Sequence, residues 1–329
     1  MTVKEVFDLR KQGKIEEAYD AIRPMYAVHQ GKYTTLCMFW TASDILKKRV
    51  EERRIEEAEN IFKALLRVQP NIDDKDGKAQ TAMMHHALRL SEVSSSFRML
   101  DFVESLPVEA LADVDWQSLT PAPSPKGEGS KHPIPSTAQR LLTRAFHEIQ
   151  VQMYGDFITR KAPAPHDEVV ASSLKVMPLL QEAMRRNPRD KHNQRYMAVV
   201  YTIMGEREKA VAIYRQLLAR HRDSYLYAEL AELTDEPGPK AALLCRAIQN
   251  QRQEKFCTAY RHDLARLLLG RDNARAAYEL NKCVDTRKAL GYHITRDIDQ
   301  MLSQLGGVQP STDAQQRDFY RRMMEKYSI

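Results

Sequence analysis

The chain has 329 residues, of which 43% are hydrophobic, so it can bury a substantial core. Its formal net charge of +6 favours acidic partners over basic ones but falls short of a dedicated nucleic-acid binder. No apolar run reaches the ~18 residues of a membrane helix, and the start of the chain has no signal-peptide pattern. The cysteines form no CxxC pair, which argues against a zinc knuckle or a disulfide framework and favours a reducing cytoplasm.

The first part of the chain predicts two helix pairs and a degenerate third. Residues 3–26 place small and apolar residues on two helices around Gly13, and residues 34–70 repeat that order. Arg53 stands where the first pair has its glycine, so we expect the second turn to form without a left-handed residue. In residues 78–106 the helical periodicity continues, but the alanine and glycine pattern is lost.

Residues 116–135 interrupt the helical pattern. They are rich in proline and glycine and have almost no apolar periodicity, which predicts a linker between two lobes, with a functional insert as the alternative. Ser136 is a suitable N-cap for the long helix expected after this segment. After a second break, residues 169–186 predict another helix.

Residues 191–224 form the clearest unit of the chain, a helix-turn-helix of 34 residues. Its small and aromatic residues keep the spacing of a stacked pair: Ala198, Tyr201, Gly205, Ala210 and Tyr214. Alanines let two antiparallel helices approach closely, and glycine tolerates the turn. These residue types at this spacing resemble the tetratricopeptide repeat (TPR) family. The resemblance implies helix pairs stacked into a superhelix with a concave surface for partners.

The end of the chain continues the helical pattern with irregular intervals. Residues 225–249 and 255–284 predict two further pairs. A final helix carries Phe319, Met323 and Tyr327 on one face. We expect this helix to cover the last exposed core face, with docking of a partner as the alternative.

The predicted fold class is all-α, a superhelical array of antiparallel helix pairs similar to a TPR solenoid, in two lobes. Strand alternation is absent from the pattern, which supports this class. The expected divisions are an N-terminal TPR-like helical lobe (1–115), a Pro/Gly-rich linker (116–135), a TPR-like helical lobe (136–308) and a C-terminal capping helix (309–329).

The motifs that signal chemistry are missing or incomplete. His147 and Glu148 begin a zinc-binding HExxH pattern, but Val151 occupies the place of the second histidine. His85 and His86 point about 100° apart on a helix, so we expect both at the surface or its boundary. We therefore predict no catalytic, cofactor or metal site and a non-enzymatic protein, with an enzyme as the minor alternative.

Basic residues concentrate in the middle of the chain. Residues 181–222 hold ten basic and four acidic side chains. The candidate partner-binding residues are Arg185, Arg186, Arg189, Lys191, His192, Arg195 and Arg266. The resemblance places Arg195, His192 and Arg266 towards the concave groove of the repeats. The alternative is a solvated edge, because isolated exposed charges contribute little without a partner.

The predicted function is a cytoplasmic scaffold or adaptor that binds a protein or peptide partner, favoured to be acidic, in a concave groove. The alternative is a nucleic-acid-associated accessory factor that uses residues 185–195; the lack of interleaved aromatic residues weakens it. The TPR clamp for a terminal carboxylate is not expected, since Val199 stands where its asparagine would be. We expect residues 185–195, the basic segment, to carry most of the affinity for an acidic partner, rather than the proline-rich residues 116–135.

Overall fold

The structure is a computed structural model that describes residues 1–118, 134–155 and 162–329. Across these residues the regular elements are α-helices and short 3-10 turns, with an isolated bridge residue and no strand, so the all-α prediction is confirmed. Packing divides the chain into unit 1, Met1–Arg189, and unit 2, Asp190–Ile329. None of the described helices combines the length and the apolar character needed to cross a membrane.

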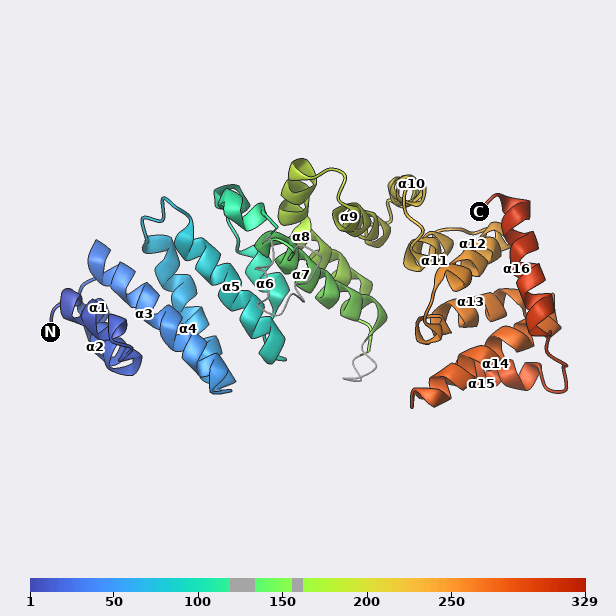
Figure 1. Ribbon diagram of the computed structural model, residues 1–329, viewed down its shortest axis with the longest axis horizontal. Helices are drawn as coiled ribbons and strands as arrows, with labels where there is room; N and C mark the ends of the chain where they lie inside the picture. Colours follow the sequence, from blue (N-terminus) through green and yellow to red (C-terminus); the bar gives the residue numbers. More distant parts are fainter. Residues whose placement is uncertain (119–133, 156–161) are drawn as a thin grey trace, which may run out of the picture. The chain divides into compact units, whose positions relative to one another are not determined.

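Unit 1 is built from helices that pack against their neighbours in the chain. They are α1 (Val3–Lys11), α2 (Ile15–Val28), α3 (Lys32–Glu51), α4 (Ile55–Val68), α5 (Lys78–Val93), α6 (Met99–Glu104), α7 (Thr137–Tyr154) and α8 (His166–Arg186). Figure 1 shows α3, α4 and α5 side by side in chain order, and each of them contacts the other two. Helix α7 packs on α5 and α6, and α8 packs on α6 and α7.

The division between the units differs from the one expected at 116–135. Of that segment, residues 119–133 lie outside the described part of the chain. Helices α6 and α7, which precede and follow it, pack together within unit 1. The fully buried Leu141 and Leu142 on α7 belong to the same apolar face, so α7 contributes to the core of the preceding helices.

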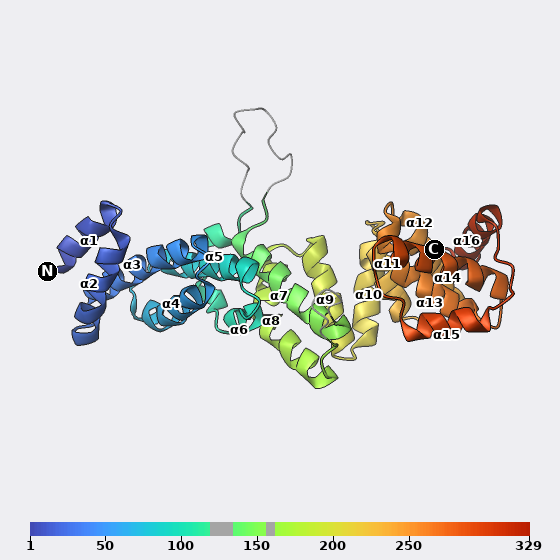
Figure 2. The same cartoon turned by 90° about the horizontal axis from the view of Figure 1, so that it is seen from below.

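Unit 2 consists of three helix hairpins and two further helices. They are α9 (Lys191–Ile203), α10 (Arg207–Leu218), α11 (Ser224–Glu232), α12 (Pro237–Asn250), α13 (Thr258–Leu268), α14 (Asn273–Ala289), α15 (Arg296–Gln304) and α16 (Asp313–Tyr327). Figures 1 and 2 show α16 beside α12, the helix that it contacts most. Pro237 and Pro239 form the first turn of α12 and not the preceding loop, since proline fits a helix start.

Buried alanines explain the close approach within these hairpins. Ala198 of α9 and Ala210 of α10 are both fully buried, and Tyr214 fills the neighbouring space. Ala18 and Ala58 are fully buried in the same way in the first two hairpins of unit 1. A side chain of one carbon lets the facing helix approach without a void, so the small-residue spacing in the sequence does set the packing.

The turn at Arg53 forms differently from the sequence prediction. Gly13 closes the first hairpin with φ +78°, and its N–H bonds to the carbonyl of Arg10 while the N–H of Lys14 bonds to that of Leu9. This is the Schellman motif, which requires a left-handed residue. Arg53 adopts φ +60° and makes the same set of bonds, so the expectation of a turn without a left-handed residue is wrong.

Replacing Arg53 by glycine should therefore stabilise unit 1. A left-handed non-glycine residue costs about 1–2 kcal/mol, and the greater freedom of glycine in the unfolded chain offsets part of that gain. We expect a net increase of about 0.5–1 kcal/mol in the free energy of unfolding, measured by urea denaturation. The matched control is Gly13→Ala, which should lower stability by about 1 kcal/mol because alanine is strained at φ +78°. No atom lies within 4 Å of the added methyl group, so no clash adds to that cost. A destabilised Arg53→Gly protein would contradict this account.

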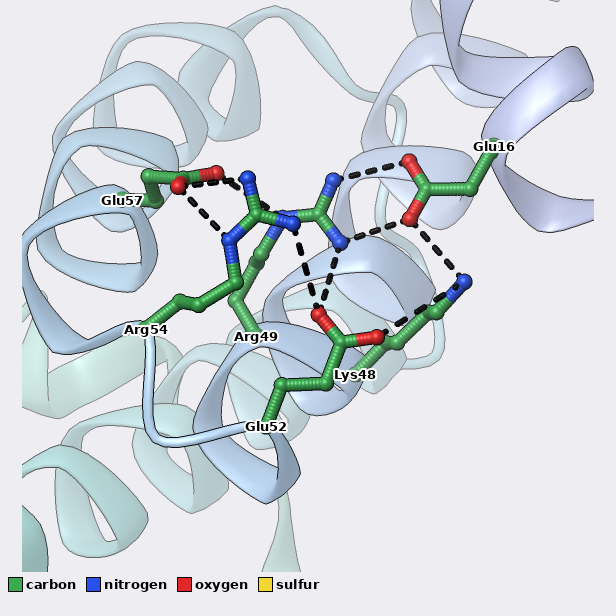
Figure 3. Close-up of polar contacts among 6 residues, drawn as sticks. All are labelled: Glu16, Lys48, Arg49, Glu52, Arg54 and Glu57. Atoms are coloured by element: carbon green, nitrogen blue, oxygen red, sulfur yellow. Dashed lines mark hydrogen bonds and ion pairs between the residues drawn. The ribbon is translucent and has the colours of Figure 1, made fainter.

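Arg49 joins three helices of unit 1 through its guanidinium group (Figure 3). Its Nη1 and Nη2 atoms donate to the carboxylate of Glu16 on α2 at 2.6 and 2.8 Å, and Nε donates to Glu57 on α4 at 3.0 Å. The bidentate hydrogen bonds from Arg49 lower the pKa of Glu16 from 4.5 to about 2. Glu16 and Arg49 lie 33 residues apart, so the contact joins neighbouring hairpins.

The stability that Glu16 provides should be lost in acid. Its folded-state pKa of about 2 is below the ordinary value of 4.5, so the carboxylate stabilises the protein fully above pH 4.5 and progressively less as the pH falls through 2. We expect the difference in urea midpoint between the unchanged protein and Glu16→Gln to shrink across that interval. Glu17→Gln is the control, because Glu17 lies 4.0 Å from Lys14 on an exposed surface. A difference in urea midpoint that does not change with pH would contradict this stabilising role of the Glu16 carboxylate.

Candidate functional site

The three candidate arginines of unit 1 differ in how far their charges are neutralised. Arg185 and Arg186 both bind the carboxylate of Glu182, at 2.6 and 2.7 Å, and Arg186 also binds Asp113 at 2.9 Å. Hydrogen bonds from Arg185 and then Arg186 lower the pKa of Glu182 from 4.5 to about 2. The Arg186 guanidinium also lies over a tryptophan ring, 4.9 Å from its centroid. Arg189 is exposed, and the described residues supply no ion pair for it.

Two candidates in unit 2, Lys191 and Arg195, form contacts between hairpins. Lys191 lies 3.1 Å from Asp223, and Arg195 donates twice to the carboxylate of Glu229, at 3.0 and 2.5 Å. The guanidinium of Arg195 also lies 4.8 Å from the centroid of the Tyr225 ring. Burial alone would lower the pKa of Arg195, but the hydrogen bonds and charge of Glu229 outweigh it and raise that pKa. Arg195 is thus engaged within the fold.

The remaining candidates are His192, on the same helix as that pair, and Arg266, on α13. His192 is exposed on α9, and the described part of the chain supplies no ion pair for it. Arg266, on α13, binds Asp263 at 2.9 Å and lines a hollow of about 220 Å³ between α11, α12 and α13. Arg266 thus lies on a different helix from Lys191, His192 and Arg195, which share α9. The sequence did contain a signal for the pairing of Arg195 with Glu229, since Glu229 follows Arg195 by 34 residues, the period of the repeat.

A hollow of unit 2 was not expected from the sequence. We call it the α10–α12 groove; it has a volume of about 730 Å³ and lies between α10, α11, the start of α12 and the end of the chain. Its apolar lining consists mainly of Val211, Leu218, Leu230, Leu233 and Leu243. Arg207, Arg215, Asp235 and Glu236 contribute charges to the same lining. The residues of α10 recur at helical spacing, which is the signal that sequence analysis could have used.

The two arginines of the α10–α12 groove have different roles. Arg207 donates through Nε to the carbonyl oxygen of Leu233 at 2.9 Å and pairs with Asp235 at 2.6 Å, so it connects α10 to the end of α11. Arg215 lies two turns further along α10 and is exposed. The described residues supply no ion pair for Arg215. The groove thus combines apolar side chains with one arginine that is available to a ligand.

Catalytic and metal-binding arrangements do not emerge from the described residues, which contain no group of three or more potential metal ligands. The carboxylate of Glu148 accepts a hydrogen bond from the backbone N–H of Met99 at 2.6 Å, so it caps α6. The four cysteines are buried and free. Cys37 is fully buried and fills the core as a small apolar residue would.

A buried serine and histidine form a polar contact between α3 and α5. The Oγ atom of Ser43 lies 2.6 Å from Nε2 of His86, and both residues are 1% exposed. Burial lowers the pKa of His86 to about 3, so this histidine stays neutral at physiological pH. The expected surface or boundary position is thus wrong for His86, whereas His85 is exposed. Because neither buried atom reaches solvent, we interpret the pair as a structural contact.

The fold defines this protein as an all-α chain of stacked helix hairpins. Residues 193–326, which lie within unit 2, match a family described as "Domain of unknown function (DUF7017)". No curated protein matches the chain. Among solved structures, a tetratricopeptide repeat protein from Parabacteroides merdae ATCC 43184 is similar over 92% of this chain and 96% of its own, with 13% sequence identity and a TM-score of 0.39.

The pairing of Glu182 predicts how the basic segment responds to polyanions. Replacing Glu182 by glutamine should free Arg185 and leave Arg186 paired with Asp113 alone, so the protein should elute from a heparin column at a higher salt concentration. Glu168→Gln on the same helix is the matched control, because it removes an equal charge from a residue with no ion pair in the described structure. Equal shifts for the two variants would show that net charge alone decides the retention.

Proposed function

We propose that the protein is a non-enzymatic repeat scaffold of the tetratricopeptide type, an adaptor whose α10–α12 groove binds a peptide segment of a partner protein. The observation that carries this proposal is the groove itself. Its volume of about 730 Å³ falls within the range of ~300–1,000 Å³ that is typical of ligand sites. Helices rather than long loops form the groove. A partner can therefore bind without the free-energy cost of ordering much of the protein.

The apolar lining indicates how a peptide would gain affinity. Val211 and Leu218 on α10 are only partly buried, as is Leu233 at the end of α11. An apolar side chain placed between them would remove these exposed carbon atoms from water, which stabilises the complex by about 25 cal/mol per Å² of buried area. Apolar anchors held in a pocket usually dominate the affinity of such interfaces.

The charges of the groove favour an acidic peptide. Arg215 can donate from two of its three guanidinium nitrogens to a carboxylate, a geometry that gives direction as well as attraction. Arg207 is less available because it already binds the carbonyl of Leu233 and Asp235. We therefore infer that a peptide carboxylate lies near Arg215 while an apolar side chain of the same peptide occupies the lining.

The ion pairs of the basic segment weigh against the nucleic-acid alternative. Arg185 and Arg186 share Glu182, and Arg195 is held by Glu229. A phosphate backbone would have to compete with these carboxylates, and its affinity comes largely from unpaired basic groups. Arg189 and His192 remain as exposed candidates, which is a small set for such a partner.

A displayed peptide library would test the role of the α10–α12 groove. Peptides selected on the unchanged protein should combine an apolar residue with a nearby carboxylate. Val211→Glu together with Leu218→Glu should weaken the selected peptides by about tenfold or more, measured by fluorescence anisotropy, because carboxylates replace the apolar lining. Arg215→Ala should weaken binding less and reduce its salt dependence.

Ala212→Glu provides the matched control, since Ala212 is exposed on the same helix but does not line the groove. Each variant should first show the circular dichroism spectrum and the melting temperature of the unchanged protein. Equal binding by the groove variants and by Ala212→Glu would contradict the proposal.

A further inference from the structure

A second hollow lies in unit 1, between α1 and the start of α3. We call it the α1–α3 pocket; its volume is about 690 Å³. Val3 and Phe7 on α1 face it from one side, and Tyr33 on α3 lines the other. The loop between α2 and α3 also lines the pocket. In this loop Gly31 packs so closely against the ring of His29 that a Cβ atom on Gly31 would lie 2.4 Å from Nε2 of His29.

The apolar residues around this pocket are unusually exposed. The side chain of Tyr33 is 71% exposed. Phe7 is only partly buried in the wall of the pocket. Large apolar side chains that gather around a concave surface are typical of binding sites, because their exposure to water is unfavourable until a partner covers them.

The charged lining of the pocket is mainly positive. Lys4, Lys11 and Lys32 lie there with a single carboxylate, that of Asp8. Lys11 is 3.9 Å from Asp8, and Lys32 is 3.3 Å from Asp73. Both lysine side chains are more than two-thirds exposed, so these contacts hold them weakly and leave them open to exchange. The described residues supply no ion pair for Lys4.

We propose that the α1–α3 pocket binds an acidic peptide segment of a partner protein. One apolar or aromatic side chain of the peptide packs between Phe7 and Tyr33, and carboxylates on either side of it pair with the lysines of the rim. Charge complementarity selects this ligand, since Lys4, Lys11 and Lys32 outnumber Asp8. The site lies in unit 1 and the α10–α12 groove in unit 2, so each can be tested without the other.

A peptide is favoured over a nucleic acid by the mixture of groups in the pocket. Apolar side chains supply much of the lining, and they gain from burial against an apolar side chain of a peptide, which a phosphate backbone lacks. Lysine attracts carboxylates and phosphates alike, so charge alone does not distinguish the two ligands. The requirement for an apolar side chain in the ligand does distinguish them.

The probe for this site is a fluorescein-labelled short peptide with one phenylalanine flanked on both sides by glutamates. Fluorescence anisotropy with the full chain should show saturable binding that weakens as salt is added. The same peptide with alanine in place of phenylalanine should bind at least about tenfold more weakly, because it lacks the apolar anchor. A single-stranded oligonucleotide of equal net charge should bind more weakly than the phenylalanine peptide.

Two pairs of protein variants locate the binding. Tyr33→Ser should weaken the phenylalanine peptide by about tenfold, whereas Val28→Ser, at an exposed residue outside the pocket lining, should leave it nearly unchanged. Lys4→Glu with Lys32→Glu should have an effect of similar size, and Lys63→Glu on the exposed face of α4 is its control. All these residues are exposed, so folding should be preserved.

The proposal is overturned if alanine replaces phenylalanine in the peptide without loss of affinity, or if Tyr33→Ser and Val28→Ser behave alike. It is also overturned if the oligonucleotide binds as tightly as the peptide, since the pocket would then respond to charge alone. Variants of Val211 and Leu218 in the α10–α12 groove should leave this binding intact. Failure of the α10–α12 groove and failure of the α1–α3 pocket can therefore be told apart.

Discussion

Arginine–carboxylate contacts between successive hairpins hold the stack together and determine which arginines remain available to a partner. Arg49 binds Glu16, 33 residues earlier, and Arg195 binds Glu229, 34 residues later. Each contact joins neighbouring hairpins and holds a guanidinium group against two carboxylate oxygens. A side chain engaged in this way stabilises the stack, but it is less available to a partner.

This use of charge changes the interpretation of the basic segment. The net charge of the segment counts its charged residues wherever they lie in the fold. The field that a partner meets depends instead on which carboxylates lie beside each arginine. The helical spacing of α8 places Glu182 beside Arg185 and Arg186, and the packing of unit 1 places Asp113 beside Arg186. Exposed positive groups without a described ion pair include Arg189 in the basic segment, Arg215 in the α10–α12 groove and Lys4 in the α1–α3 pocket.

A buried polar network fastens the last helix of unit 2. Glu279 on α14 is completely buried and accepts hydrogen bonds from Arg261 at 2.6 Å and from Gln316 and Tyr320 on α16. Burial raises the pKa of Glu279, although the charge and hydrogen bonds of Arg261 oppose that change. Removing one partner would leave an unpaired buried group, so the network specifies where α16 lies. The position of α16 in turn places residues 327–329 at one end of the α10–α12 groove.

The sequence by itself determined the helices, since the signals for them are local. Apolar periodicity, the Ser136 cap and glycine at the turns act within a few residues, and buried Ala198 and Ala210 follow from their spacing. The tertiary structure alone decided the left-handed turn at Arg53, because neighbouring helices hold a conformation that its own preference disfavours. It also decided which charges pair and where grooves form, since those outcomes depend on side chains brought together from different helices.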